Sequence, residues 1–403
     1  MKLQAKHTML AGYVGYVTQA ITINFAPLLF LTFVDEYGIS FTKISLLIAI
    51  SFITQLACDV TLARISKYIN TRATVILGHI SAVVGMTGFA WLPEVLPSPY
   101  IGLIVSVMLA AIGGGIIEVL ISPIVEACPI ENKNGAMSLL HSFYCWGLAA
   151  VVLLSTVYFH FVGIEHWQLL SCLWGIVPAV GAIAFCFVPL YELPSEEEGA
   201  DGKTRAKSPM LRSGVFWLFF GMMFCAGASE QAMSQWASTF AESGLGVSKS
   251  VGDLLGPLAF ALLMGGARVV YAKTSEKTDL SRVISTCAVL CVGTYLVTAL
   301  VPIPTVSLIG CALCGLSVGI MWPGTYSLAA RSMPTGGVTM FALLAVAGDL
   351  GCLVGPTAAG WIADLFGNDL KLSFLICTVF PILMIIFGYA IRRMAKKKKQ
   401  KGI

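Results

Sequence analysis

Apolar runs of about 20 residues recur along the whole chain, separated by short segments rich in Pro, Gly and charged residues. An α-helix rises about 1.5 Å per residue, so each run is long enough to cross a hydrocarbon core of about 30 Å. The pattern predicts an all-α membrane protein with twelve spanning helices in two six-helix bundles. We expect the spans at residues 8–33, 42–62, 73–92, 100–127, 136–162, 167–190, 214–241, 250–272, 280–301, 305–330, 338–363 and 370–391.

The first apolar run begins after Lys2 and Lys6 and contains Asn24 and Pro27. A cleaved signal peptide has a shorter apolar core and a small-residue cleavage site. We therefore interpret this run as the first span rather than as a removed leader.

The composition of the chain agrees with this interpretation. Of its 403 residues, 57% are hydrophobic and 11% are charged, whereas soluble domains carry about 25% charged residues. Twelve spans and their loops use the whole length, which leaves no room for a soluble domain.

The basic residues predict how the chain is oriented. If both termini are cytoplasmic, all but three of the 25 Lys and Arg lie on the cytoplasmic side, the exceptions being Lys43, Lys249 and Lys371. This asymmetry follows the positive-inside rule. We expect a multi-pass protein of the cell (inner) membrane with both termini in the cytoplasm.

The most polar loop lies at the middle of the chain and suggests two halves. We expect an N-terminal six-helix bundle at 1–190, a cytoplasmic linker at 191–213, and a C-terminal six-helix bundle with a basic tail at 214–403. An offset of about 204 residues relates features of the halves: Ala63-Arg64 and Ala267-Arg268, Gly147 and Gly351, Asn24 and Glu230, Glu118 and Pro323. Such a repeat predicts parallel halves with a solute site between them near the bilayer midplane.

Acidic residues inside apolar spans are the strongest candidates for function, because a charge at the bilayer centre costs about 2.5–3.5 kcal/mol. Glu118 follows three glycines and precedes Pro123, and it shares a helix face with Ser122. A buried carboxyl can bind and release protons near neutral pH, so Glu118 is a candidate for proton coupling and solute binding. The alternative is a protonated Glu that bonds a neighbouring helix.

A second polar cluster follows in span 214–241. Glu230 is joined there by Gln231, Gln235 and Trp236. Carboxylate, amide and indole groups together suit a polyol ligand, so we expect these residues to bind the solute. The alternative is a structural polar cluster between helices.

The two other acids have different expected roles. Asp349, in the middle of span 338–363, is either a second proton-coupling residue or a structural partner. Asp59 lies near the cytoplasmic end of span 42–62, where Arg64 or Arg268 could pair with it in a gating salt bridge.

Five further side chains are candidate solute ligands: Gln19, Asn24, His141, Trp322 and Tyr326. Trp322 and Tyr326 are four residues apart and share a helix face. A lone His near a helix end is more often structural, and aromatic residues within spans are more often packing groups.

Several function classes lack their signatures. Cys311 and Cys314 form a CxxC, but no Cys or His cluster accompanies it, so we expect buried structural thiols and no metal site. The chain has no HExxH, GxSxG or Walker A motif, so we expect neither an enzyme nor direct use of ATP. We expect no cofactor and no nucleic-acid partner.

The residues of spans 100–127 and 305–330 carry a family resemblance. The stretch from Gly113 to Pro123, with Glu118 five residues before the Pro, resembles a motif of the fucose permease branch of the major facilitator superfamily. Gly319-Ile320-Met321-Trp322-Pro323 is similar to the span 10 motif of that branch, and Glu230 with Trp236 resembles its span 7. The resemblance implies a transporter fold and a role for Glu118 in proton coupling and sugar binding.

The chain also departs from that branch. The pattern has an Asn-Asp pair in span 1, where this sequence has Asn24-Phe25. Ser66 stands where the superfamily has an Asp in the loop between spans 2 and 3, and Asp59 is a possible substitute. A two-carboxylate coupling scheme therefore cannot be transferred intact.

We expect a monomeric secondary transporter that moves a small polar solute such as a monosaccharide together with protons, or alternatively with Na⁺, by alternating access. A proton-driven exporter of amphipathic compounds and a uniporter remain alternatives within transport. Outside transport, the alternative is a membrane sensor with a transporter fold.

Overall fold

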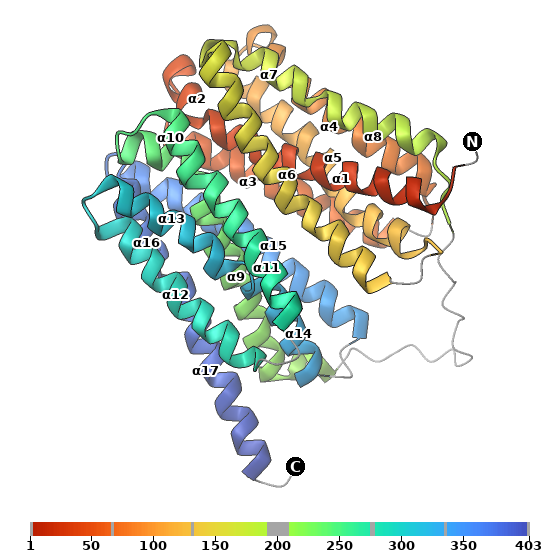
Figure 1. Ribbon diagram of the computed structural model, residues 1–403, viewed down its shortest axis with the longest axis vertical. Helices are drawn as coiled ribbons and strands as arrows, with labels where there is room; N and C mark the ends of the chain where they lie inside the picture. The colour runs from red at the N-terminus through yellow and green to blue at the C-terminus, as the bar shows by residue number, and fades with distance from the viewer. Residues whose placement is uncertain are drawn as a thin grey trace. The chain divides into compact units, whose positions relative to one another are not determined.

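The computed structural model describes residues 3–65, 68–129, 133–191, 209–274, 279–333 and 337–400. In this part of the chain every regular element is helical (Figure 1). The chain forms two compact units, Met1–Gly202 and Lys203–Ile403, called here the first and second unit. Most of the expected linker at 191–213 lies outside the described residues.

Helices in the order of the expected spans build the first unit. They are α1 (Ala5–Asn24), η1 (Ala26–Leu29), α2 (Phe30–Tyr37), α3 (Phe41–Ile65), α4 (Thr71–Val95), α5 (Pro99–Glu126), α6 (Lys133–Val162), η2 (Ile164–His166), α7 (Trp167–Trp174) and α8 (Ile176–Phe187).

The second unit follows the same plan with more interruptions. Its elements are η3 (Pro209–Arg212), α9 (Gly214–Thr239), η4 (Phe240–Gly244), α10 (Lys249–Asp253), η5 (Leu254–Leu258), α11 (Ala259–Thr274), α12 (Leu280–Leu300), α13 (Pro304–Val318), α14 (Met321–Ser332), α15 (Gly337–Leu365), α16 (Leu370–Cys377) and α17 (Val379–Gln400).

The all-helical, multi-pass architecture predicted from the sequence is confirmed. Eleven helical segments of the described residues are long and apolar enough to cross a membrane. The seventh expected span, α9, has 26 residues but is not among the eleven. Its C-terminal half carries Glu230, Gln231 and Gln235, which lower its mean hydropathy.

Two spans that carry candidate residues are interrupted. Span 1 passes from α1 into the short helix η1 directly after Asn24, with Pro27 in η1. Span 10 breaks between α13 and α14 at Gly319 and Ile320. Non-helical backbone at membrane depth is tolerated where it is buried in protein or lines a cavity, so these breaks mark places where polar groups gather.

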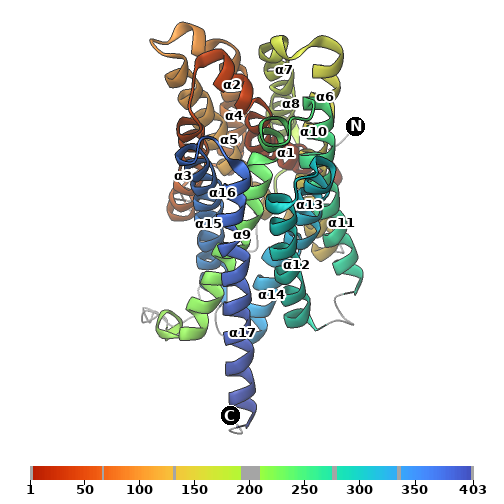
Figure 2. The ribbon, with the colours of Figure 1, turned by 90° about the vertical axis from the view of Figure 1, so that its left-hand side faces the viewer.

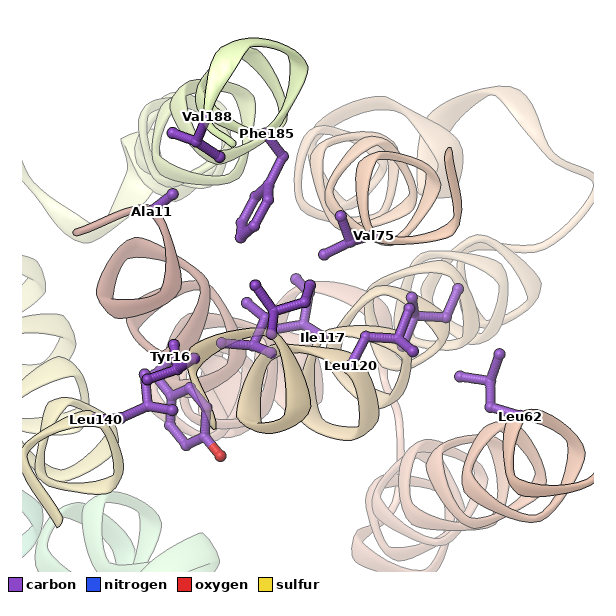
Figure 3. Close-up of a cluster of buried hydrophobic side chains, with 13 residues drawn as sticks. Ala11, Tyr16, Leu62, Val75, Ile117, Leu120, Leu140, Phe185 and Val188 are labelled. Carbon is purple, nitrogen blue, oxygen red and sulfur yellow. The ribbon is translucent and has the colours of Figure 1, made fainter. Parts of the chain in front are cut away.

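Helix α5 lies at the centre of the first unit and packs against α1, α3 and α4. Glycine makes the approach to α4 close, since a Cβ at Gly113 would lie 2.6 Å from the backbone nitrogen of Ala82. In the C-terminal half of α5, Ile117 and Leu120 pack among apolar side chains from other helices of the unit (Figure 3). Burial of this cluster fixes the rotation of α5 about its axis.

In the second unit, α9 packs along α15 and α17 (Figure 2). A Cβ at Gly351 on α15 would lie 2.8 Å from the backbone nitrogen of Ala228 on α9. Such contact of backbone with backbone is typical of small residues at membrane helix interfaces.

The contacts inside the first unit recur inside the second. Helix α1 packs on α6 as α9 packs on α15. Helices α3 and α5 pair in the same way as α11 and α13. The matched glycines take part, because a Cβ at Gly147 would lie 2.8 Å from the Cβ of Ala20 on α1, at the interface that corresponds to that of Gly351. Gly115 and Gly319 likewise contact α3 and α11. The two units share one scaffold.

Candidate functional site

Glu118 lies on α5 beside the apolar face of that helix. Ile117, Ile121 and Ile124 are buried at the spacing of one helix face. Glu118 is rotated by about 100° from Ile117, out of that apolar cluster and toward α1 and α3.

Neutral amides hold the Glu118 carboxylate. Gln55 of α3 donates a hydrogen bond from Nε2 to Oε2 of Glu118, and the side chain of Gln19 of α1 also hydrogen-bonds Glu118. Among the described residues, no Lys, Arg or His forms a salt bridge with Glu118. The structure thus places the expected residues Gln19 and Glu118 together, with Gln55 as a partner that the sequence analysis missed.

A hydroxyl contact lies one turn after Glu118. The phenol oxygen of Tyr16 is 2.7 Å from Oγ of Ser122. The ring of His141 meets the ring of Tyr16 edge-on, with centroids 5.1 Å apart. His141 therefore lies near the Glu118 face of α5 and reaches it through Tyr16.

Asn24 occupies the break in span 1. Its Nδ2 donates to the carbonyl of Ala20 at 2.9 Å and to the hydroxyl of Tyr144 at 3.3 Å. These two bonds fix the Asn24 side chain at the end of α1 and connect it to α6. A role in solute binding stays a prediction.

The gating pair of Asp59 with Arg64 or Arg268 also stays a prediction. The Arg64 side chain lies outside the described residues. Asp59 interacts electrostatically with Glu118. Arg268 belongs to the second unit, where it has partners of its own.

In that unit Glu230 of α9 meets a cation. Nη2 of Arg268 on α11 lies 3.8 Å from Oε2 of Glu230. Nε of the same guanidinium donates to the carbonyl of Gly319 at 3.2 Å, at the break in span 10. Arg268 therefore connects spans 7, 8 and 10 around a buried acid.

The amides beside Glu230 form a short chain. Nε2 of Gln235 donates to Oε1 of Gln231 at 3.1 Å, and Nε2 of Gln231 lies 3.5 Å from Oε1 of Glu230. Trp236 is different, because its ring is fully buried and its Nε1 donates to the carbonyl of Pro356 at 2.9 Å. This bond ties α9 to α15, and a role of Trp236 in solute binding stays a prediction.

The aromatic pair of span 10 lies directly after its break. Trp322 and Tyr326 meet edge-on with centroids 6.4 Å apart, and both are partly exposed. The Trp322 ring packs against Gly348 of α15, where no side chain is in the way. Asp349, next to Gly348, is partly buried.

A charged cluster that the sequence analysis missed lies between spans 7 and 8. Nζ of Lys249 is 3.2 Å from both Oε1 of Glu242 and Oδ2 of Asp253, and Oγ of Ser238 donates to Asp253 at 2.5 Å. Glu242 lies outside the spans; burial raises the pKa of its carboxyl, and Lys249 opposes this shift. Glu242 and Asp253 flank Lys249 in the sequence, and this pattern could have indicated the cluster.

The two sets of residues offer different chemistry. In the first unit a carboxyl bonded by neutral amides can exchange a proton without breaking an ion pair. In the second unit a carboxylate, a guanidinium, amides and aromatic faces provide donors, acceptors and stacking surfaces. Among the described residues, no group of three or more His, Cys, Asp or Glu is arranged to hold a metal ion.

Comparisons with known proteins agree on the fold. The family model described as Major Facilitator Superfamily matches residues 10–339. No curated protein matches the chain by sequence.

Solved structures resemble the chain along almost its whole length. A bacterial homolog of the human lysosomal transporter Spinster, inward-facing and occupied, has a TM-score of 0.74 at 15% identity and covers 96% of this chain and 97% of its own. The D-xylose-proton symporter has a TM-score of 0.75 at 14% identity, covering 96% of each chain. A variant of the E. coli fucose:proton symporter has a TM-score of 0.63 at 17% identity, covering 96% and 98%. At these identities the likeness concerns the fold.

Proposed function

The chain belongs to the Major Facilitator Superfamily, and from that premise we propose that this transporter is a proton-coupled symporter of a small polar solute such as a monosaccharide. It acts as a monomer in the cell membrane, with both termini in the cytoplasm and each unit forming one six-helix bundle.

The bonding of Glu118 carries the proposal. An acid held by Gln55 and Gln19 accepts hydrogen bonds when ionised, and after protonation it has a donor of its own. The change of charge therefore requires no cation to leave. A site that must load and release a proton in each cycle needs this property.

The second unit supports a polar solute. Glu230 and Arg268 present charge-assisted acceptors and donors, and Trp322 and Tyr326 add aromatic faces beyond the break in span 10. Sugar hydroxyls use both kinds of contact. An amphipathic cargo would need a broader and more apolar site.

Two of the structural neighbours are described as proton symporters of sugars, which is consistent with this proposal. In the proposed cycle, Glu118 takes up a proton, solute binds, and the bundles rock to expose the site to the other side. Coupling requires that proton and solute together favour the transition more than either alone.

The test is proton uptake into proteoliposomes that enclose a pH-sensitive dye. D-xylose, L-fucose, D-galactose and D-glucose are added one at a time to wild type, Glu118→Gln and Asp35→Asn. Asp35 is exposed at the end of α2, so its variant is the matched control. We expect a sugar-dependent signal in wild type and in the control and none in Glu118→Gln.

Other outcomes distinguish the alternatives. Labelled sugar that enters without any proton signal would indicate a uniporter or another coupling ion. Absence of both signals with all four sugars would contradict a monosaccharide substrate.

A further inference from the structure

Asp59 lies one turn after Gln55 on α3, so both side chains project from the same face of the helix. That face meets α5 closely, because a Cβ at Gly115 would lie 2.9 Å from the Cβ of Cys58 and 3.3 Å from the carbonyl oxygen of Gln55. Gln55 reaches Glu118 across this interface. Asp59 therefore lies beside the Glu118 site at its cytoplasmic end.

One oxygen of Asp59 is buried without compensation. Among the described residues, Oδ1 of Asp59 has no hydrogen-bond partner. A buried carboxylate oxygen without a donor is costly, so a carboxyl in this state is stabilised by a proton.

Among the described residues, a charge of the same sign, that of Glu118, acts on Asp59. The carboxylates of Asp59 and Glu118 interact electrostatically, and two like charges in one buried site disfavour the doubly ionised state. Within the part of the chain that the structure describes, the thiol of Cys58, beside Asp59, and the phenol of Tyr16, beside Glu118, are the other titratable groups that face the pair. His141 contacts the far side of Tyr16.

We propose that Asp59 and Glu118 form a single proton-binding pair across the contact of α3 and α5, in which two carboxylates share one proton. The inference rests on the proposed symport and adds a second carboxyl, from span 2, to the proton site. Gln55 and Gln19 stabilise the ionised form of Glu118, whereas Oδ1 of Asp59 has no donor among the described residues. The shared proton therefore resides mainly on Asp59 at rest and moves toward Glu118 when its amide partners turn to the solute.

A pair of this kind titrates as a unit. It loses its two protons in two steps, and the step at higher pH belongs to both residues together. Removal of either carboxyl abolishes the repulsion, so the remaining carboxyl loses its proton at lower pH by about one unit or more.

The test is infrared difference spectroscopy of the full chain in detergent, following the carboxylic-acid C=O stretch over a pH series without solute. Wild type is compared with Asp59→Asn and Glu118→Gln, and Asp35→Asn is the control. We expect the high-pH step in wild type and the control, and a shift to lower pH in each of the two pair variants.

A high-pH step that persists unshifted in either pair variant would overturn the pair. A step that moves when Na⁺ replaces choline at constant ionic strength would also overturn it, in favour of a metal-cation site. Each variant removes one carboxyl and measures the same interaction between Asp59 and Glu118. The test therefore needs only one of the two variants to be folded, as judged by its elution in size-exclusion chromatography. Because no solute is added, failure of the pair leaves the symport to be judged by proton uptake.

Discussion

Glu118 in the first unit and Glu230 in the second are both acids inside long helices, but their partners differ. Gln55 and Gln19 bond Glu118, whereas Arg268 lies 3.8 Å from Glu230. Neutral partners permit a change of charge, and an ionic partner opposes it. We therefore propose that proton exchange takes place in the first unit, whereas Glu230 in the second unit keeps a cation partner.

The scaffold around these acids is repeated, although the acids are not. Gly115 and Gly319 have corresponding contacts, as do Gly147 and Gly351. Glu118, however, has no acid at its corresponding place in the second unit, which falls at Trp322 and Pro323. Helix packing preserves the repeat through small residues, while polar side chains have diverged between the units.

The largest stability effect is expected from breaking the ion pair of the second unit. Arg268→Gln leaves Glu230 buried without a cation, and we expect a loss of about 2 kcal/mol, less than for a fully buried pair because Arg268 is partly exposed. Thermal unfolding in detergent measures this loss of stability. The double variant Arg268→Gln/Glu230→Gln should recover part of it. Gln55→Leu should cost less, since Glu118 can protonate. Equal losses would contradict the distinction between the acids.

A smaller effect is expected from the repeated glycines. Gly351→Ala places a Cβ against backbone atoms of α9, whereas Gly147→Ala meets the Cβ of Ala20 and the Cα of Val17. We expect losses of about 1 to 1.5 kcal/mol, at the low end for overpacked sites and larger at Gly351, because backbone yields less readily. Gly293→Ala is the control, since nothing lies within 4 Å of the added Cβ. An equal fall in unfolding temperature for Gly293→Ala and Gly351→Ala would refute these close contacts.

The smallest effect concerns Glu242, for which the first unit has Gly38 at the corresponding place. The folded-state pKa of Glu242 is raised. Its stabilising contribution is therefore complete below the unfolded pKa of about 4.3 and is lost as pH rises through the folded pKa. Glu242→Gln cannot titrate, so we expect its unfolding temperature to fall less with rising pH than that of wild type. Parallel curves would contradict this.

The sequence predicted the helices better than the contacts between them. The lengths of the apolar runs and the breaks at Pro and Gly predicted the spans. Backbone groups in the bilayer must form hydrogen bonds within the segment, so each apolar run forms a helix. It also identified Glu118 and Glu230 as functional candidates, since an acid is costly there. The sequence predicted a gating role for Arg268 and did not predict its contact with Glu230. Pairing between helices depends on how each helix is rotated about its axis and how deep it lies in the membrane.

Gln55 was missed for a similar reason. A single amide in an apolar run carries little signal by itself, and only the approach of α3 to Gly115 brings it to Glu118. Its position four residues before Asp59 was the available indication.

The central claim is that proton exchange belongs to Glu118 and that Glu230 serves the solute. Its most direct test compares Glu118→Gln and Glu230→Gln in proteoliposomes for two quantities, exchange of labelled sugar at equal pH and sugar-driven proton uptake. The account predicts that Glu118→Gln keeps exchange and loses proton uptake, whereas Glu230→Gln loses both because solute no longer binds. Sugar-driven proton uptake that persists in Glu118→Gln would contradict it.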